Sequence, residues 1–244
     1  MTRIFSLTLL QAVSDWQRGG DAKQKKRRGQ ALKVACASLP IKYRSCALIC
    51  FRNIALPKGG VWDLIGEDRL DETISAWTPD ITVAKVIKGG VPPDKQGLQG
   101  VILGIYPAPE NIIVNLWALY TDPAFVAALD SHKAEIIGYH DGAGRFGNDQ
   151  REVVLEIASV TQQDIYSLGG HSSPFEDLVE QAAWDIHGRI PTSHERNALL
   201  LSAEEVRTEA GPHWLCPDAT QRVLERLKSP AKLLREVKRQ QDTP

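Results

Sequence analysis

The sequence predicts an α+β protein in which helices flank a mainly antiparallel β core. Helical periodicity occupies both ends of the chain, whereas the middle consists of short β-rich segments separated by glycine and proline. With 244 residues, 43% of them hydrophobic, the chain is long enough to bury a sizeable core. We therefore expect N-terminal basic helices over residues 1–42, a β core over 43–170, and a C-terminal helical region over 171–244 that packs on the core.

Two helices are expected at the N-terminal end. Apolar residues in the segment 5–17 recur at close to helical spacing, and Gly19 with Gly20 would end that helix. The next segment is rich in lysine and arginine. It predicts a second helix that ends near Leu39, before Pro40.

The central segments predict strands and short helices. Residues 45–56 are apolar on both sides of Arg52 and predict a strand, with a turn after it at Pro57, Gly59 and Gly60. The elements expected next are a strand over 73–78, a helix over 79–90 with proline in its first turn, a strand over 100–107, a strand leading into a helix over 111–132, and strands over 135–139 and 151–160 joined by a glycine-rich loop.

From Pro174 onwards the pattern is helical. Helices are expected over residues 173–188, 202–210, 217–228 and 230–241. The last two carry an apolar stripe with basic flanks, which favours docking onto the domain and, as a second interpretation, binding to a partner.

The net charge of −1 conceals an uneven distribution. Residues 17–44 hold nine lysines and arginines against one acid, and residues 221–240 hold seven against two. Such basic ends indicate a polyanionic partner, a protein partner that covers one region, or only solvated helix faces. Charge alone leaves these three interpretations open.

Neither a metal site nor a disulfide framework is expected. The four cysteines, Cys36, Cys46, Cys50 and Cys216, have no C-x-x-C spacing and no neighbouring set of histidines. The apolar runs are shorter than the ~20 residues of a membrane helix, so we expect a cytoplasmic protein that does not act on a membrane.

Three chemical features follow one another in the β core. Arg52 lies within an apolar strand, Ser75 and Thr78 belong to a strand that runs into a helix, and Gln150 with Glu152 opens a later strand as Gln-x-Glu. In this order, over residues 43–168, the sequence resembles the mono-ADP-ribosyltransferases of the Arg, Ser-Thr-Ser, Glu class, to which many bacterial toxins belong. The resemblance implies a catalytic core of two small, mainly antiparallel sheets around a cleft that binds NAD as substrate, without a metal.

The chemistry of NAD agrees with these residue types. Breaking the bond between ribose and nicotinamide passes through an oxocarbenium-like centre, which a carboxylate beside the ribose stabilises, so Glu152 is the expected catalytic residue. The planar donors of Arg52 suit phosphate oxygens, and the diphosphate would offset the desolvation of the guanidinium. In the resembled class a serine orients the glutamate, and that serine maps to Ser75. Trp77 and Thr78 complete the expected NAD-binding set.

The residue two before the catalytic glutamate helps to select the acceptor in the resembled class. A glutamine there goes with asparagine, related side chains or nucleobases, so Gln150 argues against an arginine-directed enzyme. Its amide both donates and accepts, as an amide or a base edge requires. Tyr139 and Phe146, in the preceding loop, resemble the target-recognition turn of the class, where an aromatic ring stacks on the acceptor.

Three assignments have alternatives. Arg44 competes with Arg52, which we prefer because Arg44 lies near the start of the strand and is more easily solvated. The class motif appears here as Ser-Ala-Trp-Thr, so Ser75 and Thr78 both remain open. Glu156 follows Glu152 by four residues and faces the same side of a strand, which would also suit a glycosidase-like pair or a solvated edge.

The resulting hypothesis is an NAD-dependent ADP-ribosyltransferase, an intracellular bacterial toxin that modifies a nucleic-acid base and releases nicotinamide. Because an active toxin harms its host, we also expect a neutralising antitoxin protein. Two alternatives are ADP-ribosylation of an asparagine- or glutamine-type side chain of a protein, and a non-catalytic protein whose basic ends bind nucleic acid or a partner.

Overall fold

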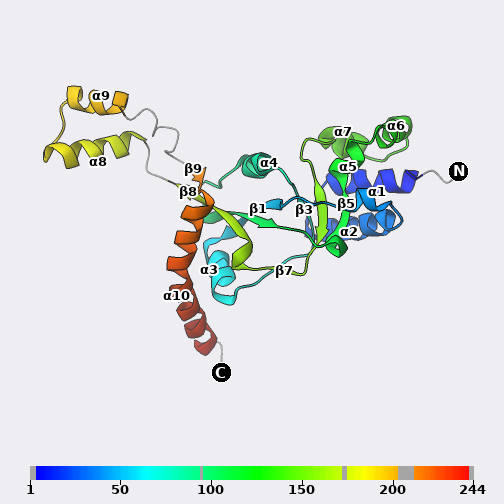
Figure 1. The fold of residues 1–244 in the computed structure, drawn as a ribbon, viewed down its shortest axis with the longest axis horizontal. Helices are drawn as coiled ribbons and strands as arrows, with labels where there is room; N and C mark the ends of the chain where they lie inside the picture. Colours follow the sequence, from blue (N-terminus) through cyan, green and yellow to red (C-terminus); the bar gives the residue numbers. More distant parts are fainter. Residues whose placement is uncertain (1–3, 94–95, 172–174, 203–211, 242–244) are drawn as a thin grey trace.

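Three small antiparallel sheets with helices around them form the α+β fold of the computed structural model, which describes residues 4–93, 96–171, 175–202 and 212–241 (Figure 1). The larger sheets have the strand orders β1-β4-β8-β9 and β3-β6-β5, and β2 pairs with β7. The strands are β1 (Cys50–Pro57), β2 (Leu70–Asp71), β3 (Ile74–Trp77), β4 (Leu98–Ile105), β5 (Ile112–Asn115), β6 (Val153–Glu156), β7 (Ser159–Val160), β8 (Ile165–His171) and β9 (Pro212–Trp214). The expected class and the flanking helices are confirmed, with three sheets among the described residues instead of two.

Helices lie at both ends of the sheets (Figure 1). They are α1 (Leu7–Gln17), α2 (Ala22–Cys36), α3 (Lys58–Glu67), α4 (Ile81–Val86), α5 (Leu116–Tyr120), α6 (Pro123–His132), α7 (Ala143–Phe146), α8 (Phe175–His187), α9 (Ser193–Ser202) and α10 (Pro217–Gln241). Short 3-10 turns include η2 (Ile87–Gly89) and η5 (Tyr139–Asp141). Figure 1 shows α8 and α9 beside each other and away from the sheets.

The two N-terminal helices form as the sequence predicts. Ser6 caps α1 by accepting a hydrogen bond from the backbone nitrogen of Leu9, and the helix ends before Gly19, whose φ is +66°. Asp21 and Gln24 form a reciprocal capping box at the start of α2. These caps add to the helical spacing and to the glycine and proline stops from which the two helices were predicted.

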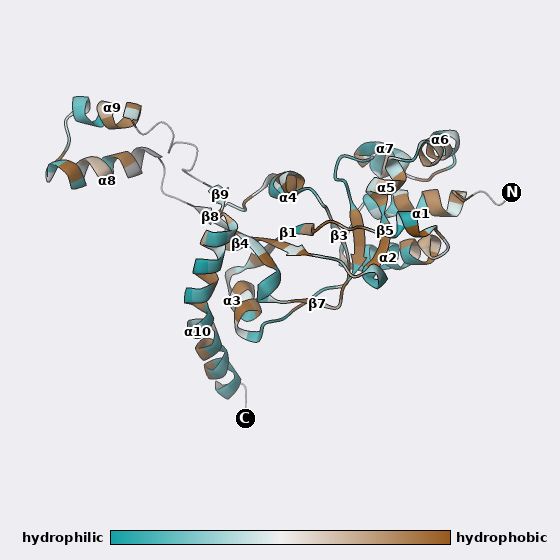
Figure 2. Ribbon diagram, viewed as in Figure 1, coloured by the Kyte–Doolittle hydropathy of each residue, from teal (hydrophilic) through white to brown (hydrophobic). Residues whose placement is uncertain are grey.

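Two hydrophobic clusters make up most of the core. The N-terminal cluster joins α1, α2, α5 and α6 to β5, and its fully buried members include Leu10, Leu32 and Phe125. The central cluster joins β1, β4, β6 and β8 to α3 and α10, with Leu64 and Leu103 fully buried. Figure 2 shows the strands between these clusters as largely hydrophobic and much of α10 as hydrophilic.

The turn expected at Pro57, Gly59 and Gly60 is wrong, because helix α3 begins at Lys58. Burial of its apolar face in the central cluster outweighs the low helix propensity of its glycines. Gly66 has a packing role, since a Cβ there would lie 2.9 Å from the carbonyl oxygen of Ala231 in α10. The close approach of α10 to α3 therefore requires glycine at this position.

The strand expected over residues 135–139 is also wrong. The chain there turns from α6 into η5, with Gly138 at a φ of +70°. Apolar composition was the only signal for a strand over residues 135–139. Burial of Ile136 in the N-terminal cluster explains that composition without a strand. The strand expected over 151–160 is divided into β6 and β7, which pair with different strands, β3 and β2.

The C-terminal region combines predicted and unpredicted elements. α10 is one helix that continues through Pro230 instead of the two expected helices, and its docking onto α3 is confirmed by Leu224 and Ala231 in the central cluster. Strand β9 pairs with β8 and so adds to the core sheet. Neither β8, β9 nor α9 was expected, and the helix predicted over 202–210 lies, apart from Ser202, outside the described residues.

Candidate functional site

A cavity of about 360 Å³ opens beside the point where the two larger sheets meet. Phe51 of β1 and Thr78, just after β3, exchange both backbone hydrogen bonds, at 2.7 and 2.9 Å. The volume lies within the ~300–1,000 Å³ of small-molecule sites. The lining residues are Trp16, Gln17, Gly19, Lys25, Phe51, Arg52, Asn53, Ile74, Ser75, Ala76, Trp77, Thr78, Ala84, Ile87, Lys88, Phe146, Gln150 and Glu152. The fold thus brings together every predicted site residue except Tyr139.

Glu152 is the buried carboxylate of this cavity. It immediately precedes β6, which anchors it between β3 and β5, and only 6% of the residue is exposed. The indole nitrogen of Trp16 donates a 2.5 Å hydrogen bond to its Oε1. Burial raises the pKa of Glu152 to about 7, although the Trp16 bond and the charge of Arg52 act in the opposite direction. The carboxyl therefore changes charge near neutral pH.

The Arg52 guanidinium is held by the protein itself. Its Nε donates to Glu72 Oε1 at 3.3 Å and its Nη1 donates to the carbonyl oxygen of Ala76 at 3.2 Å. The anionic partner expected from a ligand diphosphate is thus already supplied by Glu72. Of the two arginines considered from the sequence, Arg52 lines the cavity and Arg44 does not.

Two lysines join Arg52 at the cavity, and neither was identified from the sequence. Lys88 donates to the carbonyl oxygen of Asn53 at 3.4 Å through a partly buried bond, although the residue as a whole is exposed. Lys25 comes from α2 and is also exposed. Burial lowers the pKa of Lys88, and the charges of Arg52 and Lys25 lower it further. Three cations therefore line the cavity, against two carboxylates: Glu152 in the lining, and Glu72, which pairs with Arg52. The excess of positive charge favours an anionic ligand.

No local pattern distinguishes these lysines in the sequence. Lys25 is one of several basic residues on α2, and Lys88 precedes two glycines at the end of a helix. Lys88 has a φ of +57°, which is uncommon for a residue other than glycine, and Asn53 holds this segment by donating to the carbonyl oxygens of Ala84 and Ile87. The position of the Lys88 side chain therefore follows from the long-range hydrogen bonds of Asn53.

The hydroxyl groups of Ser75 in β3 and of Thr78 just after it bond to neighbouring residues. Ser75 Oγ accepts from the indole nitrogen of Trp77 at 2.9 Å and donates to the carbonyl oxygen of Thr73 at 3.4 Å. Thr78 Oγ1 accepts from the backbone nitrogen of Asp80. In the part of the chain that the structure describes, neither hydroxyl bonds to Glu152, and the orienting contact expected of Ser75 comes from Trp16 instead.

The loop before β6 is anchored on α1. Ser14 Oγ accepts from the backbone nitrogen of Ala143, and the Gln17 amide donates to the carbonyl oxygen of Gly147 at 3.0 Å. Gly142 lies so close to the Ser14 carbonyl that a side chain there would clash. The loop expected to recognise the acceptor is thereby held against the N-terminal helix.

Two of the three expected acceptor residues line the cavity. Phe146 is covered by the Arg145 guanidinium 5.1 Å from its ring centre, and the Gln150 amide makes no hydrogen bond to a described residue. Tyr139 lies elsewhere, packed on the N-terminal cluster and edge-on to His140.

Glu156 lies away from the cavity. Its carboxylate pairs with Lys33 Nζ of α2 at 2.5 Å. A glycosidase-like pair of Glu152 and Glu156 facing one cavity is therefore not formed.

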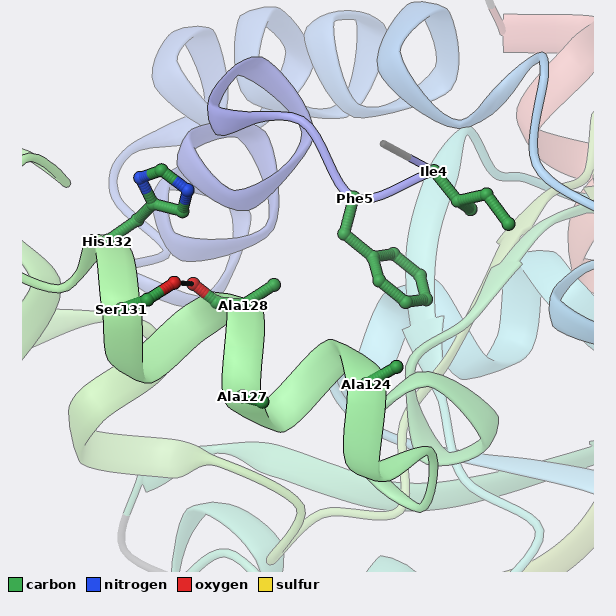
Figure 3. Close-up of a pocket in the computed structure, with 7 residues that line it drawn as sticks. All are labelled: Ile4, Phe5, Ala124, Ala127, Ala128, Ser131 and His132. Atoms are coloured by element: carbon green, nitrogen blue, oxygen red, sulfur yellow. Dashed lines mark hydrogen bonds between the residues drawn. The ribbon is translucent and has the colours of Figure 1, made fainter. Parts of the chain in front are cut away.

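Another hollow, of about 460 Å³, lies between the segment before α1 and helix α6 (Figure 3). Alanines, Ile4 and Phe5 form most of its wall, and Ser131 donates to its own helix at the carbonyl oxygen of Ala128. His132 contacts Glu135 at 2.7 Å. This hollow lacks the convergent polar groups of the cavity beside β3 and contains no predicted site residue.

No protein-family model matches the chain, and the searches of curated proteins and of solved structures found no match either. Among the described residues, no helix is both long and apolar enough to span a membrane. Within the same residues, no cluster of three or more histidines, cysteines or acids could hold a metal ion.

Proposed function

We propose that this chain is an NAD-dependent ADP-ribosyltransferase whose active site is the cavity between β1 and β3. The observation that carries the proposal is the convergence on this cavity of Arg52 with Gln150 and Glu152, which belong to a distant segment of the chain. A buried carboxylate, a cationic wall and a free amide are the groups that the reaction requires, for the sugar, the diphosphate and the acceptor respectively.

In the proposed reaction the bond between ribose C1′ and the nicotinamide nitrogen breaks, and its electron pair leaves with neutral nicotinamide. Ionised Glu152 stabilises the positive charge that develops on the ribose, in a site with little water to screen it. An acceptor nitrogen then forms a bond to C1′ and releases one proton. With a pKa of about 7, Glu152 is ionised in most molecules only above neutral pH. The positive charge of the bound nicotinamide ring would lower this pKa.

The positions of the cations favour one orientation of the proposed substrate. Arg52, Lys25 and Lys88 would hold the diphosphate, so that the nicotinamide ribose lies toward Glu152. Trp77 contributes mainly to the core, since it is only 2% exposed and belongs to the central cluster. Its indole keeps Ser75 and the β3 backbone in place.

A nucleic-acid base is the proposed acceptor. Gln150 offers a donor and an acceptor to a base edge, and Phe146 with Arg145 offers a stacking surface beside it. The basic face of α2 adjoins the cavity through Lys25, which suits a phosphate backbone. The basic residues of α10 support this less, because Arg235 is paired with Asp63 and Glu67 of α3.

A protein amide is the second acceptor class, because the same Gln150 amide would pair with it. We further propose that the activity is that of an intracellular toxin, held in check by an antitoxin protein. Both statements depend on the transfer activity.

The test is incubation of the purified chain with NAD labelled in the adenylate part and a cell lysate, followed by nuclease or protease. We expect macromolecular label that nuclease removes, and no label with Glu152→Gln. Label that only protease removes would overturn the nucleic-acid acceptor. Equal nicotinamide release by both proteins would overturn the catalytic role of Glu152, and NAD left intact by the wild type would favour the non-catalytic binding protein.

A further inference from the structure

Two cysteines lie next to each other in the segment that enters β1. The sulfur atoms of Cys46 and Cys50 are 3.7 Å apart, and both thiols also approach the carbonyl oxygen of Leu48 at 3.7 Å. Cys46 is partly exposed and Cys50 is buried. Residues 45–49 between η1 (Ile41–Tyr43) and β1 have no regular secondary structure.

This arrangement divides the roles of the two thiols. The hydrogen bond between the two sulfurs lowers the pKa of Cys46 to about 6, and the same bond together with burial raises the pKa of Cys50. The thiolate is the form that attacks electrophiles, so Cys46 is the nucleophile and Cys50 the neighbouring thiol that resolves the product.

The other two cysteines differ in this respect. Cys36 is fully buried, and burial raises the pKa of its thiol to about 12. Cys216 is exposed but no other cysteine of the described residues lies beside it. A reaction that needs both a thiolate and an adjacent thiol is therefore available only at the Cys46–Cys50 pair among the described residues.

We propose that Cys46 and Cys50 form a redox modification site that a hydroperoxide converts to a disulfide. The Cys46 thiolate attacks the terminal peroxide oxygen, so that an S–O bond forms and the O–O bond breaks, and hydroxide leaves from hydrogen peroxide or an alkoxide from an alkyl hydroperoxide. The Cys50 sulfur then attacks Cys46, the S–S bond forms, the S–O bond breaks, and water leaves with the Cys50 proton. The two sulfurs lose two electrons in total and the hydroperoxide gains them.

Closing the bond requires the sulfurs to approach from 3.7 Å to about 2.0 Å. The irregular segment that carries Cys46 can supply this movement, while Cys50 is held in the β1–β4 ladder opposite Ile105. The modification lies two residues before Arg52 on the same strand, yet it depends on the thiols alone and not on any activity of the cavity.

The test is titration of the full-length protein with hydrogen peroxide, followed by alkylation of free thiols and tryptic peptide mass spectrometry. Cleavage after Arg44 and Arg52 places Cys46 and Cys50 in one peptide, residues 45–52, whereas Cys36 lies in residues 34–42. We expect the 45–52 peptide to lose two hydrogens and to escape alkylation, and a reducing thiol to reverse this. Cys36 should remain alkylatable once the protein is unfolded.

Two variants make the assignment specific. In Cys50→Ser, Cys46 should accumulate as sulfenic acid that a cyclic 1,3-dione traps, because its resolving thiol is absent. Cys216→Ser should behave as wild type. Alkylation of both thiols in the 45–52 peptide at peroxide concentrations that already oxidise Cys216 would overturn the proposal, as would an equal yield of trapped sulfenic acid at Cys36 or Cys216.

Discussion

Trp16 on the first helix donates a hydrogen bond of 2.5 Å to the carboxylate of Glu152, although the two residues lie 136 positions apart. This bond connects the N-terminal helix pair to the candidate catalytic residue. The helices are therefore part of the site as well as part of the core.

Replacing Trp16 with phenylalanine should raise the pKa of Glu152 above its value of about 7. In the wild type this bond stabilises the charged form of Glu152, and the variant lacks it. Hydrogen bonds to charged groups contribute roughly 1.5–3 kcal/mol, or about one to two pKa units. Carboxyl-carbon NMR titration would measure the shift. Any transfer activity should then need a correspondingly higher pH.

Trp117→Phe is the matched control for this experiment. Trp117 donates to the Glu152 carbonyl oxygen through its backbone nitrogen, a bond that the substitution keeps, and its ring lies near Arg151. An equal pKa shift in both variants would show that Trp16 acts only through packing.

The contribution of Glu152 to the stability of the folded protein should fall as pH rises from about 4.5 to about 7. The folded-state pKa of Glu152 is raised from 4.5, so between these values the folded protein retains a proton that the unfolded chain has lost. The full shift corresponds to on the order of 3 kcal/mol for this buried group. Glu152→Gln removes this contribution, because its side chain does not titrate.

Urea unfolding of wild type and Glu152→Gln at about pH 5 and about pH 8 would measure the difference. The variant should gain stability relative to wild type at the higher pH. A stability difference that is the same at both pH values would contradict a raised Glu152 pKa.

Lys88→Met should weaken NAD binding about tenfold, which corresponds to the loss of roughly 1.4 kcal/mol from one charge-assisted contact. Methionine keeps an apolar stem of similar length, so the packing beside Asn53 changes little. Calorimetric titration at two salt concentrations would give the affinity and its reduced salt dependence. Arg44→Met, outside the cavity, is the control and should bind as wild type.

Gln150→Glu should abolish transfer to a base or amide acceptor while release of nicotinamide to water continues. The amide donor is lost, and the added negative charge opposes an acceptor carbonyl. Separate assays of nicotinamide and of macromolecular label would resolve the two reactions. Loss of nicotinamide release together with loss of transfer would indicate that Gln150 contributes to NAD binding and not to acceptor selection.

Local patterns in the sequence were sufficient for several parts of the site. Helical spacing with Gly19 and Gly20 predicted α1, and a basic segment ending before Pro40 predicted α2. Strand patterns placed Arg52 on β1 and Ser75 on β3, whereas Glu152, expected on a strand, lies just before β6. These features depend on residues within one turn or one strand of each other, which is why they could be predicted.

Contacts between distant segments decided the remainder. Helix α3 forms despite its glycines because it packs on α10, and residues 135–139 form a turn because Ile136 is buried in the N-terminal cluster. The strands β8 and β9 complete a sheet whose partners lie far away in the chain.

The sequence by itself determined the order of the chemical groups, Arg52 and then Gln150 with Glu152. Only the tertiary structure determined which groups touch them: Trp16 at the carboxylate, Glu72 at the guanidinium and Lys88 beside it. The physical reason is that burial and charge act through space. The pKa of Glu152 is set by side chains that approach it from other helices and strands, and no local spacing records that approach.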